Sequence, residues 1–382
     1  MKRTAIWILG ILSVGFGILP ALDATSVSAA ALSKRILCST FPIYQITRNV
    51  AQGRDAVSVE LMLPAQLGCP HDYALTPQDM KKLSRADVLI VNGLGMEEFL
   101  GVSVRKANAK LRVIDSSTGI RDVLRYTEEK EHDHELTKKI NTKEKPARHA
   151  HSPHDADPHH HDGINPHLFT SPKLTARLAM NIAAGLSKVD PDGATIYAKN
   201  AQQYADKLNA LADDFTALGK TVKNNRIITQ HGVFDYLARD MDLEVCAVVQ
   251  AHAGQEPSAA EMLEIIRTAK EKKVTAVFTE PQYPARVGQT IAREAGILTA
   301  TLDPVATGPE NAPLDYFETI MRQNMVILKE TLGASNIIDS HGSGGSAVVT
   351  MSQSPERVQS IRLPFSDFPG AAHHSNAGIA TA

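Results

Sequence analysis

Short hydrophobic runs alternate with longer stretches of mixed polar and apolar residues along most of this chain. Such short runs predict strands, and the longer stretches place apolar residues at helical spacing. The first half contains the predicted elements strand 36–41, helix 43–51, strand 57–63, helix 76–86, strand 88–92, helix 97–108 and strand 112–115. This alternation is typical of parallel sheets whose strands are joined by crossover helices.

The same alternation resumes in the second half. Its predicted elements are strand 226–230, helix 233–240, strand 243–249, helix 258–273, strand 276–279, helix 285–295, strand 298–302 and helix 313–332. Two helix starts carry capping signals: Thr76 is followed by Pro77 and Asp79, and Ser258 is followed by Glu261. We therefore expect helices to begin at these two positions.

Two further helices are predicted between the halves. Ser171-Pro172 opens a helix over 172–189 whose apolar residues form a single face. The next helix begins at Asp190-Pro191, and its apolar residues from Tyr197 to Val222 come close to a heptad repeat. A coiled coil is one interpretation, but a long helix packed along one domain is favoured.

The predicted fold is therefore α/β with two lobes, each a parallel sheet flanked by helices, joined by one long rigid connecting helix. We place the N-terminal lobe at 31–171, the connecting helix at 172–189 and the C-terminal lobe at 190–333. After removal of a signal segment, about 350 residues remain, which is more than one hydrophobic core usually supports. Two lobes are the expected solution.

Both ends of the chain depart from this pattern. Residues 1–30 have a basic start, an apolar run shorter than the roughly 20 residues of a membrane span, and small residues suited to cleavage. We interpret them as a cleaved signal peptide of an exported, periplasmic protein. Residues 334–382 are rich in Gly and Ser without periodicity, and we expect a flexible tail.

Charge and cysteine content narrow the function further. The formal net charge is −2, so no basic field for nucleic acid is present. Cys38, Cys69 and Cys246 allow at most one disulfide, and the sequence does not choose among the three pairings. Cys69 lies two residues before His71, which leaves a thiolate ligand open. A structural role is favoured because no Cys-x-x-Cys spacing accompanies it.

Candidate metal chemistry is concentrated in histidines. Eight of the fifteen histidines lie between His132 and His161, in a polar insert (130–162) that we expect to form a mobile, His-rich loop within the N-terminal lobe. Imidazole is the commonest protein ligand for borderline transition metals. Such a tract can hold Zn²⁺ loosely, but it cannot by itself define a tight site.

Four side chains outside that tract define the predicted metal site. His71, His231 and Asp303 follow predicted strands, and His167 ends the His-rich insert. Ligands bind beyond the carboxyl ends of strands in open parallel sheets, so the four are expected to converge between the lobes. Three imidazoles and one carboxylate suit Zn²⁺. Glu280 also follows a strand, and we expect it to support a ligand before binding metal itself.

These residues lie in segments that resemble a known family, the zinc/manganese substrate-binding proteins of ABC importers, in the high-affinity periplasmic zinc branch. The resemblance extends over 34–333, and its segments are 63–73 (LPAQLGCPHDY), 165–168 (NPHL), 231–237 (HGVFDYL), 280–282 (EPQ) and 303–304 (DP). It implies two α/β lobes joined by one long helix. It also implies that the matching His71, His167, His231 and Asp303 hold the metal.

Some features of the sequence distinguish the branch, and others depart from the family. His231 in place of a carboxylate, together with the His-rich insert, resembles the zinc branch more than the manganese branch. Asn165 stands where the family usually has Asp, so a charged partner of the site is missing or replaced. The tail at 334–382, with His373 and His374, matches nothing in the family pattern.

The predicted function is capture of Zn²⁺ in the periplasm, with Mn²⁺ less favoured, and delivery to the permease of an ABC importer. We expect a monomer that is not an enzyme. One alternative is a zinc-dependent hydrolase with Glu280 as general base, and another is a metal-binding adhesin or zinc store. Four protein ligands leave no open water position, and no nucleophile motif is visible, so the hydrolase is disfavoured.

Overall fold

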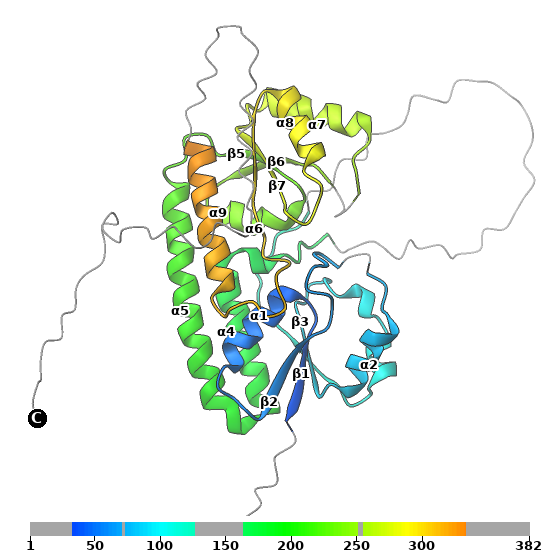
Figure 1. Ribbon diagram of the computed structural model, residues 1–382. Helices are drawn as coiled ribbons and strands as arrows, with labels where there is room; N and C mark the ends of the chain where they lie inside the picture. Colours follow the sequence, from blue (N-terminus) through cyan, green and yellow to red (C-terminus); the bar gives the residue numbers. More distant parts are fainter. Residues whose placement is uncertain (1–32, 71–72, 127–162, 251–254, 334–382) are drawn as a thin grey trace, which may run out of the picture.

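The structure is a computed structural model that describes residues 33–70, 73–126, 163–250 and 255–333. The predicted signal peptide, the His-rich insert 130–162, the tail 334–382 and His71 lie outside these residues. The described chain forms two α/β lobes, with long helices along one side of both (Figure 1). The predicted fold class is confirmed.

The N-terminal lobe contains a four-stranded parallel sheet of order β2-β1-β3-β4. Its strands are β1 (Lys34–Cys38), β2 (Val57–Leu61), β3 (Val88–Val91) and β4 (Arg112–Asp115). Its helices are α1 (Phe41–Ala51), α2 (Pro77–Arg85) and α3 (Ser103–Ala107). Side chains alternate along each strand: Ile36 and Cys38 join the core shared with α1, whereas Leu37 joins the core beneath α2.

The C-terminal lobe repeats this order as β6-β5-β7-β8, again with all strands parallel. Its strands are β5 (Arg226–Thr229), β6 (Glu244–Val248), β7 (Ala276–Thr279) and β8 (Leu298–Thr301). Its helices are α6 (Asp235–Asp240), α7 (Ala259–Glu271), α8 (Arg286–Ala295) and α9 (Tyr316–Gly333). Helices α7 and α8 cover the outer face of the sheet, and their buried residues form a core of their own.

The helix that runs between the lobes is α5 (Ala194–Gly219), not the predicted 172–189 segment. Helix α4 (Pro172–Val189) packs against α1 and β4 of the N-terminal lobe and, over its length, against α5. Helix α5 begins beside the N-terminal lobe, contacts α1, and continues to α6 and α9 of the other lobe (Figure 1). The amphipathic pattern correctly predicted both helices but did not reveal which of them reaches both lobes.

Local signals were accurate at most element ends. Each predicted strand is present within a few residues, and complete capping boxes start α2 at Thr76 and α7 at Ser258. The predicted helix 97–108 was wrong: a short helix η1 (Glu98–Leu100) ends at Gly101, and α3 follows. Gly101 adopts φ 42, which interrupts the helical backbone.

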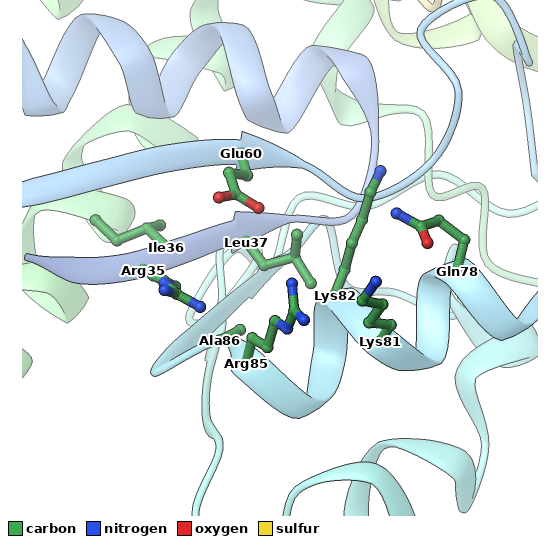
Figure 2. Close-up of a pocket in the computed structure, with 9 residues that line it drawn as sticks. All are labelled: Arg35, Ile36, Leu37, Glu60, Gln78, Lys81, Lys82, Arg85 and Ala86. Carbon is green, nitrogen blue, oxygen red and sulfur yellow. The ribbon is translucent and has the colours of Figure 1, made fainter.

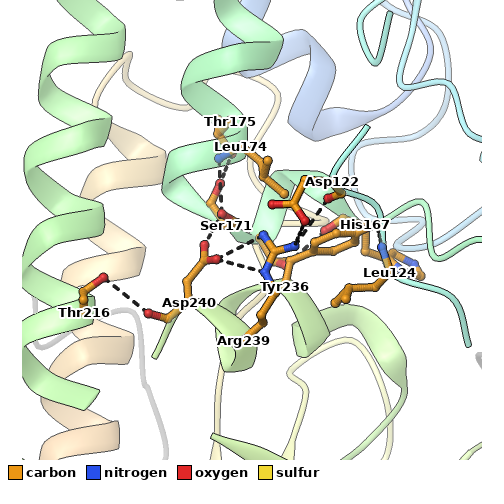
Figure 3. A network of polar contacts seen from close by, with 11 residues as sticks. Asp122, Leu124, His167, Ser171, Leu174, Thr175, Thr216, Tyr236, Arg239 and Asp240 are labelled. Carbon is orange, nitrogen blue, oxygen red and sulfur yellow. Dashed lines mark hydrogen bonds and ion pairs between the residues drawn. The ribbon is translucent and has the colours of Figure 1, made fainter. Parts of the chain in front are cut away.

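Polar contacts join the lobes where α4 begins (Figure 3). The Ser171 hydroxyl caps α4 by accepting from the Leu174 amide, and it donates to the Asp240 carboxylate at the end of α6. Arg239 pairs with Asp240 at 3.1 Å and with Asp122 at 3.1 Å. The junction between the lobes is therefore fixed by hydrogen bonds as well as by apolar packing.

Three other short helices complete the described chain: η2 (Leu168–Thr170), η3 (Pro191–Gly193) and η4 (Gly232–Phe234). In the part of the chain that the structure describes, no helix combines the length and the hydrophobicity needed to cross a bilayer. All three cysteines are described and all are free thiols. Cys38 is buried at the end of β1, and Cys246 lies in β6 of the other lobe.

Candidate metal centre between the lobes

Three potential ligands meet at the carboxyl ends of the two sheets. Their atoms all lie within 4.8 Å of one another, and they come from Cys69, His167 and His231. Cys69 lies in the loop after β2, His167 immediately precedes η2, and His231 follows β5. The Cys69 Sγ atom is 3.3 Å from Nε2 of His167 and 3.5 Å from Nε2 of His231. Two of the four predicted ligands therefore lie together.

The other two predicted ligands are placed differently. His71 lies outside the described residues, so its position remains a prediction. Asp303 follows β8 as expected, but it is not a member of the three-residue group. Its Oδ1 atom accepts from the Val305 amide at 2.8 Å. Its backbone N–H donates to the side-chain oxygen of Asn324, and its backbone carbonyl accepts from the side-chain NH₂ group of Asn324. Burial, aided by the negative charge of Glu280 and opposed by the hydrogen bond from the Val305 amide, raises the pKa of Asp303 to about 6.

A buried carboxylate supports His231. The Nδ1 atom of His231 lies 2.6 Å from Oε1 of Glu280, and the second oxygen of Glu280 accepts from Gln282 at 2.6 Å. Both His231 and Glu280 are almost fully buried. Burial lowers the pKa of His231, but the charges of Glu280 and Cys69 outweigh it and raise that pKa to about 10. Glu280 thus orients the imidazole so that Nε2 faces the other two donor atoms.

An amide supports His167 in the same way. The Nδ1 atom of His167 lies 2.8 Å from the Asn165 side-chain oxygen, so Nδ1 carries the proton and Nε2 presents its lone pair. The amide group of Asn165 donates to the Gly232 carbonyl at 2.7 Å and to the Asp235 carboxylate at 2.9 Å. These two acceptors fix which atom of Asn165 is oxygen. The family usually has a carboxylate at position 165. In this protein the nearest carboxylate in the chain of hydrogen bonds is that of Asp235, which contacts His167 through Asn165.

Aromatic rings flank the two histidines of the donor group. Tyr126 and Phe169 lie edge-on to His167, with ring centroids 6.5 and 6.0 Å away, and Tyr283 lies edge-on to His231 at 5.7 Å. Tyr126 also places its hydroxyl 3.2 Å from Nδ1 of His167. A cation bound here would be shielded from water, which strengthens its interactions with the charged and polar groups around it.

A cavity of about 280 Å³ lies elsewhere and suits a metal poorly (Figure 2). It is lined by Arg35, Ile36, Leu37, Glu60, Gln78, Lys81, Lys82, Arg85 and Ala86. Four of these side chains are basic and one is acidic, so the charge in this groove repels cations. The Nζ atom of Lys82 already donates to two backbone carbonyls at the end of β2. The candidate metal centre is therefore identified by the chemistry of its donors and not by a cavity.

The sequence did not predict that Cys69 lies beside the two histidines. The only signal available was its position two residues before His71, and that spacing matches no common cysteine metal motif. The three donors are brought together by the fold across separations of 98 and 162 residues from Cys69 to the two histidines. Such a cluster is visible only in three dimensions.

Comparison with known proteins agrees with this description. A model of the family "Zinc-uptake complex component A periplasmic" matches residues 36–331. The high-affinity zinc uptake system protein ZnuA of Bacillus subtilis is 28% identical over 332 residues, covering 85% of this chain and 97% of that protein. The zinc-binding protein AdcA of Streptococcus pyogenes is 28% identical over 334 residues, covering 87% of this chain. The chain spans 62% of the length of that AdcA protein.

Solved structures show the same fold. A crystal structure of ZnuA superposes with a TM-score of 0.61 at 26% identity, covering 78% of this chain and 99% of that one. The binding protein FpvC of Pseudomonas aeruginosa, in complex with Mn²⁺, gives a TM-score of 0.62 at 26% identity, covering 78% and 98% of the two chains. The family resemblance drawn from the motifs is confirmed. Because the matched segment extends over most of the sequence, the chain belongs to the family of periplasmic zinc-uptake complex component A proteins.

Proposed function

We propose that the protein captures Zn²⁺ on the outer side of the cytoplasmic membrane and delivers it to the permease of an ABC importer. The observation that carries the proposal is the buried group of donors between the lobes, in which each imidazole has its Nδ1 atom held and its Nε2 atom turned toward the others. Membership of the zinc-uptake family and the names of the zinc-binding relatives ZnuA and AdcA support it. Cleavage of residues 1–30, a periplasmic location and a monomeric state belong to the same proposal.

His167 and His231 are the zinc ligands with the most support. We retain His71 as a third ligand because it follows Cys69 closely in the same loop. Asp303 is retained as the fourth because its carboxyl group is buried near the negative charge of Glu280, and a cation would relieve that repulsion. Imidazole donors favour Zn²⁺ over the harder Mn²⁺, which prefers oxygen ligands.

The two alternative functions have less support. A hydrolase would use Glu280 as a general base, but both oxygens of Glu280 are engaged, one by His231 and one by Gln282. The family is also one of binding proteins for metal uptake and not an enzyme family. An adhesin or zinc store would act through the His-rich insert and the tail, whereas the donor group described above lies in neither segment.

The test is metal content together with competition titration against a chelating dye, because the only tryptophan, Trp7, lies in the predicted signal peptide. The wild-type protein should hold one tightly bound zinc ion. His71→Ala and His231→Ala should each weaken binding by more than about tenfold. His373→Ala, in the tail, is the matched control and should leave affinity unchanged. Zinc-dependent ester or peptide hydrolysis, or tight binding that survives His231→Ala, would contradict the proposal.

The His-rich insert should not be needed for the tight site. We expect it to act as a collector that raises the local zinc concentration, so deletion of 130–162 should remove weak sites and preserve the tight one. A solved ZnuA structure with a deletion of its residues 138–173 contains zinc, and that chain is 27% identical to this one with a TM-score of 0.61. Loss of tight binding on deletion would instead assign the insert to the primary site.

A further inference from the structure

We propose that Cys69 is itself a metal ligand, so that its thiolate and the Nε2 atoms of His167 and His231 form a sulfur-containing site selective for soft and borderline cations. The inference rests on the proposed function and specifies the chemistry of the same site. It assigns a ligand that was disfavoured when only sequence spacing was considered.

The distances match those of ligands sharing one ion. Zinc forms bonds of about 2.3 Å to sulfur and about 2.0–2.1 Å to imidazole nitrogen, and with tetrahedral angles these place sulfur and nitrogen about 3.5 Å apart. The observed separations from Cys69 Sγ are 3.3 Å and 3.5 Å. The sulfur therefore already lies close to the separation from each nitrogen that a shared zinc ion requires.

The three donor atoms present their electron pairs to one point between the lobes. Both Nδ1 atoms face acceptors, Asn165 for His167 and Glu280 for His231, so in the neutral imidazoles both Nε2 atoms are acceptors. A thiol has one proton and can donate it to only one of the two. A cation can bind all three electron pairs. On binding, zinc forms one bond to Sγ and two to Nε2, while the thiol proton and any proton on Nε2 pass to solvent.

The sulfur is held in place by both lobes. The loop after β2 is bonded to the C-terminal lobe, since the Gly308 amide donates to the Ala65 carbonyl at 3.1 Å and the Gln66 side chain donates to the Gly308 carbonyl at 2.8 Å. Gly68, directly before Cys69, adopts φ +79, and a Cβ atom there would lie 3.5 Å from Gln282 of the opposite lobe. The thiol is thus presented to the two histidines by an anchored segment.

The two other cysteines have surroundings that differ from those of Cys69. Cys38 is fully buried in β1, and burial raises the pKa of its thiol to about 12, against a small opposing effect of Thr47. Cys246 lies in β6, where its thiol is 3.8 Å from the Glu244 carbonyl. Among the described residues, only Cys69 stands in a group of three metal-binding side chains. Cys246 therefore offers the matched control.

The experiment is zinc K-edge X-ray absorption on the full chain loaded with less than one equivalent of Zn²⁺, so that the tightest site fills first. The wild-type protein and Cys246→Ser should both show a sulfur neighbour at about 2.3 Å beside nitrogen and oxygen at about 2.0–2.1 Å. Cys69→Ser should lose the sulfur neighbour while remaining folded by circular dichroism. Its zinc affinity should fall by more than about tenfold, and its preference for Zn²⁺ over Mn²⁺ should narrow.

The outcomes separate this inference from the proposed function. Tight, stoichiometric zinc with no sulfur neighbour in the wild-type protein would overturn the role of Cys69 and leave zinc capture intact. A sulfur neighbour that persists in Cys69→Ser, or vanishes in Cys246→Ser, would also overturn it. Failure of the wild-type protein to bind zinc tightly at all would instead overturn the proposed function.

Discussion

The two lobes share one topology but use it differently. Each has a parallel sheet of the same strand order, and each has a glutamate near the end of its third strand in sequence, Glu97 after β3 and Glu280 after β7. The oxygens of Glu97 accept from the Ser39 hydroxyl and the backbone N–H of Asn92, both at 2.7 Å, and from the backbone N–H of Gly93 at 3.0 Å. Glu280 instead directs one oxygen to His231.

This difference shows how one fold provides both a scaffold and a site. In the N-terminal lobe the carboxylate satisfies backbone donors of its own turn, so it stabilises the loop and has no oxygen left for an imidazole. In the C-terminal lobe the carboxylate is directed at an imidazole, whose orientation and basicity it controls. Two glutamates at related positions should therefore respond to the same substitution in opposite ways.

The largest effect should come from Glu280→Gln. The substitution keeps an acceptor for His231 but removes the negative charge behind it, which weakens the imidazole as a ligand. We expect zinc affinity to fall by about 10–100-fold with little loss of folding stability. Competition with a chelating dye measures the change, and urea unfolding of the metal-free protein checks stability. Unchanged affinity would mean that Glu280 does not act on the metal through His231.

Glu97→Gln should give the opposite result. A glutamine amide cannot accept from all three donors, and its NH₂ group would face an N–H or O–H group that needs an acceptor. We expect the free energy of unfolding to fall by about 1–3 kcal/mol while zinc affinity stays the same. The neighbouring Glu98, whose side chain is exposed, provides the control Glu98→Gln. A loss of affinity without loss of stability would place Glu97 in the metal site and end the contrast with Glu280.

The amide that supports His167 can be tested by exchanging two side chains. Asn165→Asp restores the residue usual in the family but sets a second carboxylate against Asp235, at a position where the present amide is 2.9 Å away. We expect a loss of about 1–2 kcal/mol in stability and weaker zinc binding. The double variant Asn165→Asp with Asp235→Asn should recover both, because the hydrogen bond is re-formed in reverse. Failure of the double variant to recover would show that Asp235 does not carry the displaced charge.

Much of this fold could be predicted from local pattern alone. Alternation within strands is directly encoded, as in Ile36 and Cys38 against Leu37, and so are helix starts with a capping hydroxyl and an acid three residues on. The connecting helix was misassigned because an amphipathic face shows that a helix packs without showing against what. The break at Gly101 was missed because a single glycine does not change the average pattern of its segment.

The site was predicted in part for a related reason. His167 and His231 were identified because each stands beside an element boundary and in a family motif. The contacts of Cys69 with the two histidines were not predicted, because these partners lie 98 and 162 residues away and no short spacing signals such a contact. The sequence marked Asn165 as a departure near the site, but the contribution of Asp235 was not predicted, because it depends on an amide that reaches across the junction.

The smallest effect should come from weakening the ion pair that attaches the N-terminal lobe to α4 and α5. Arg54 makes two hydrogen bonds to Asp190, at 2.9 and 3.0 Å, and Tyr197 donates to the same carboxylate at 2.6 Å. The hydrogen bonds from Arg54 lower the pKa of Asp190, with Tyr197 adding to the effect against the cost of burial. Because the folded pKa is lowered, this stabilisation is present above the ordinary Asp value of about 3.9 and is lost as pH falls below it.

Asp190→Asn should therefore cost about 1 kcal/mol in the free energy of unfolding at pH 7. The difference from the wild-type protein should shrink at pH 3, below the ordinary Asp pKa, because the carboxylate of the unfolded chain is then largely protonated and the ion pair contributes less to stability. Urea unfolding at both pH values measures this, and the exposed Asp192→Asn on the same turn is the matched control. Zinc affinity at pH 7 should be unchanged, because the ion pair lies where α4 meets α5 and makes no contact with the donors. If the difference in the free energy of unfolding were just as large at pH 3, the stabilisation would come from packing and not from the charge of Asp190.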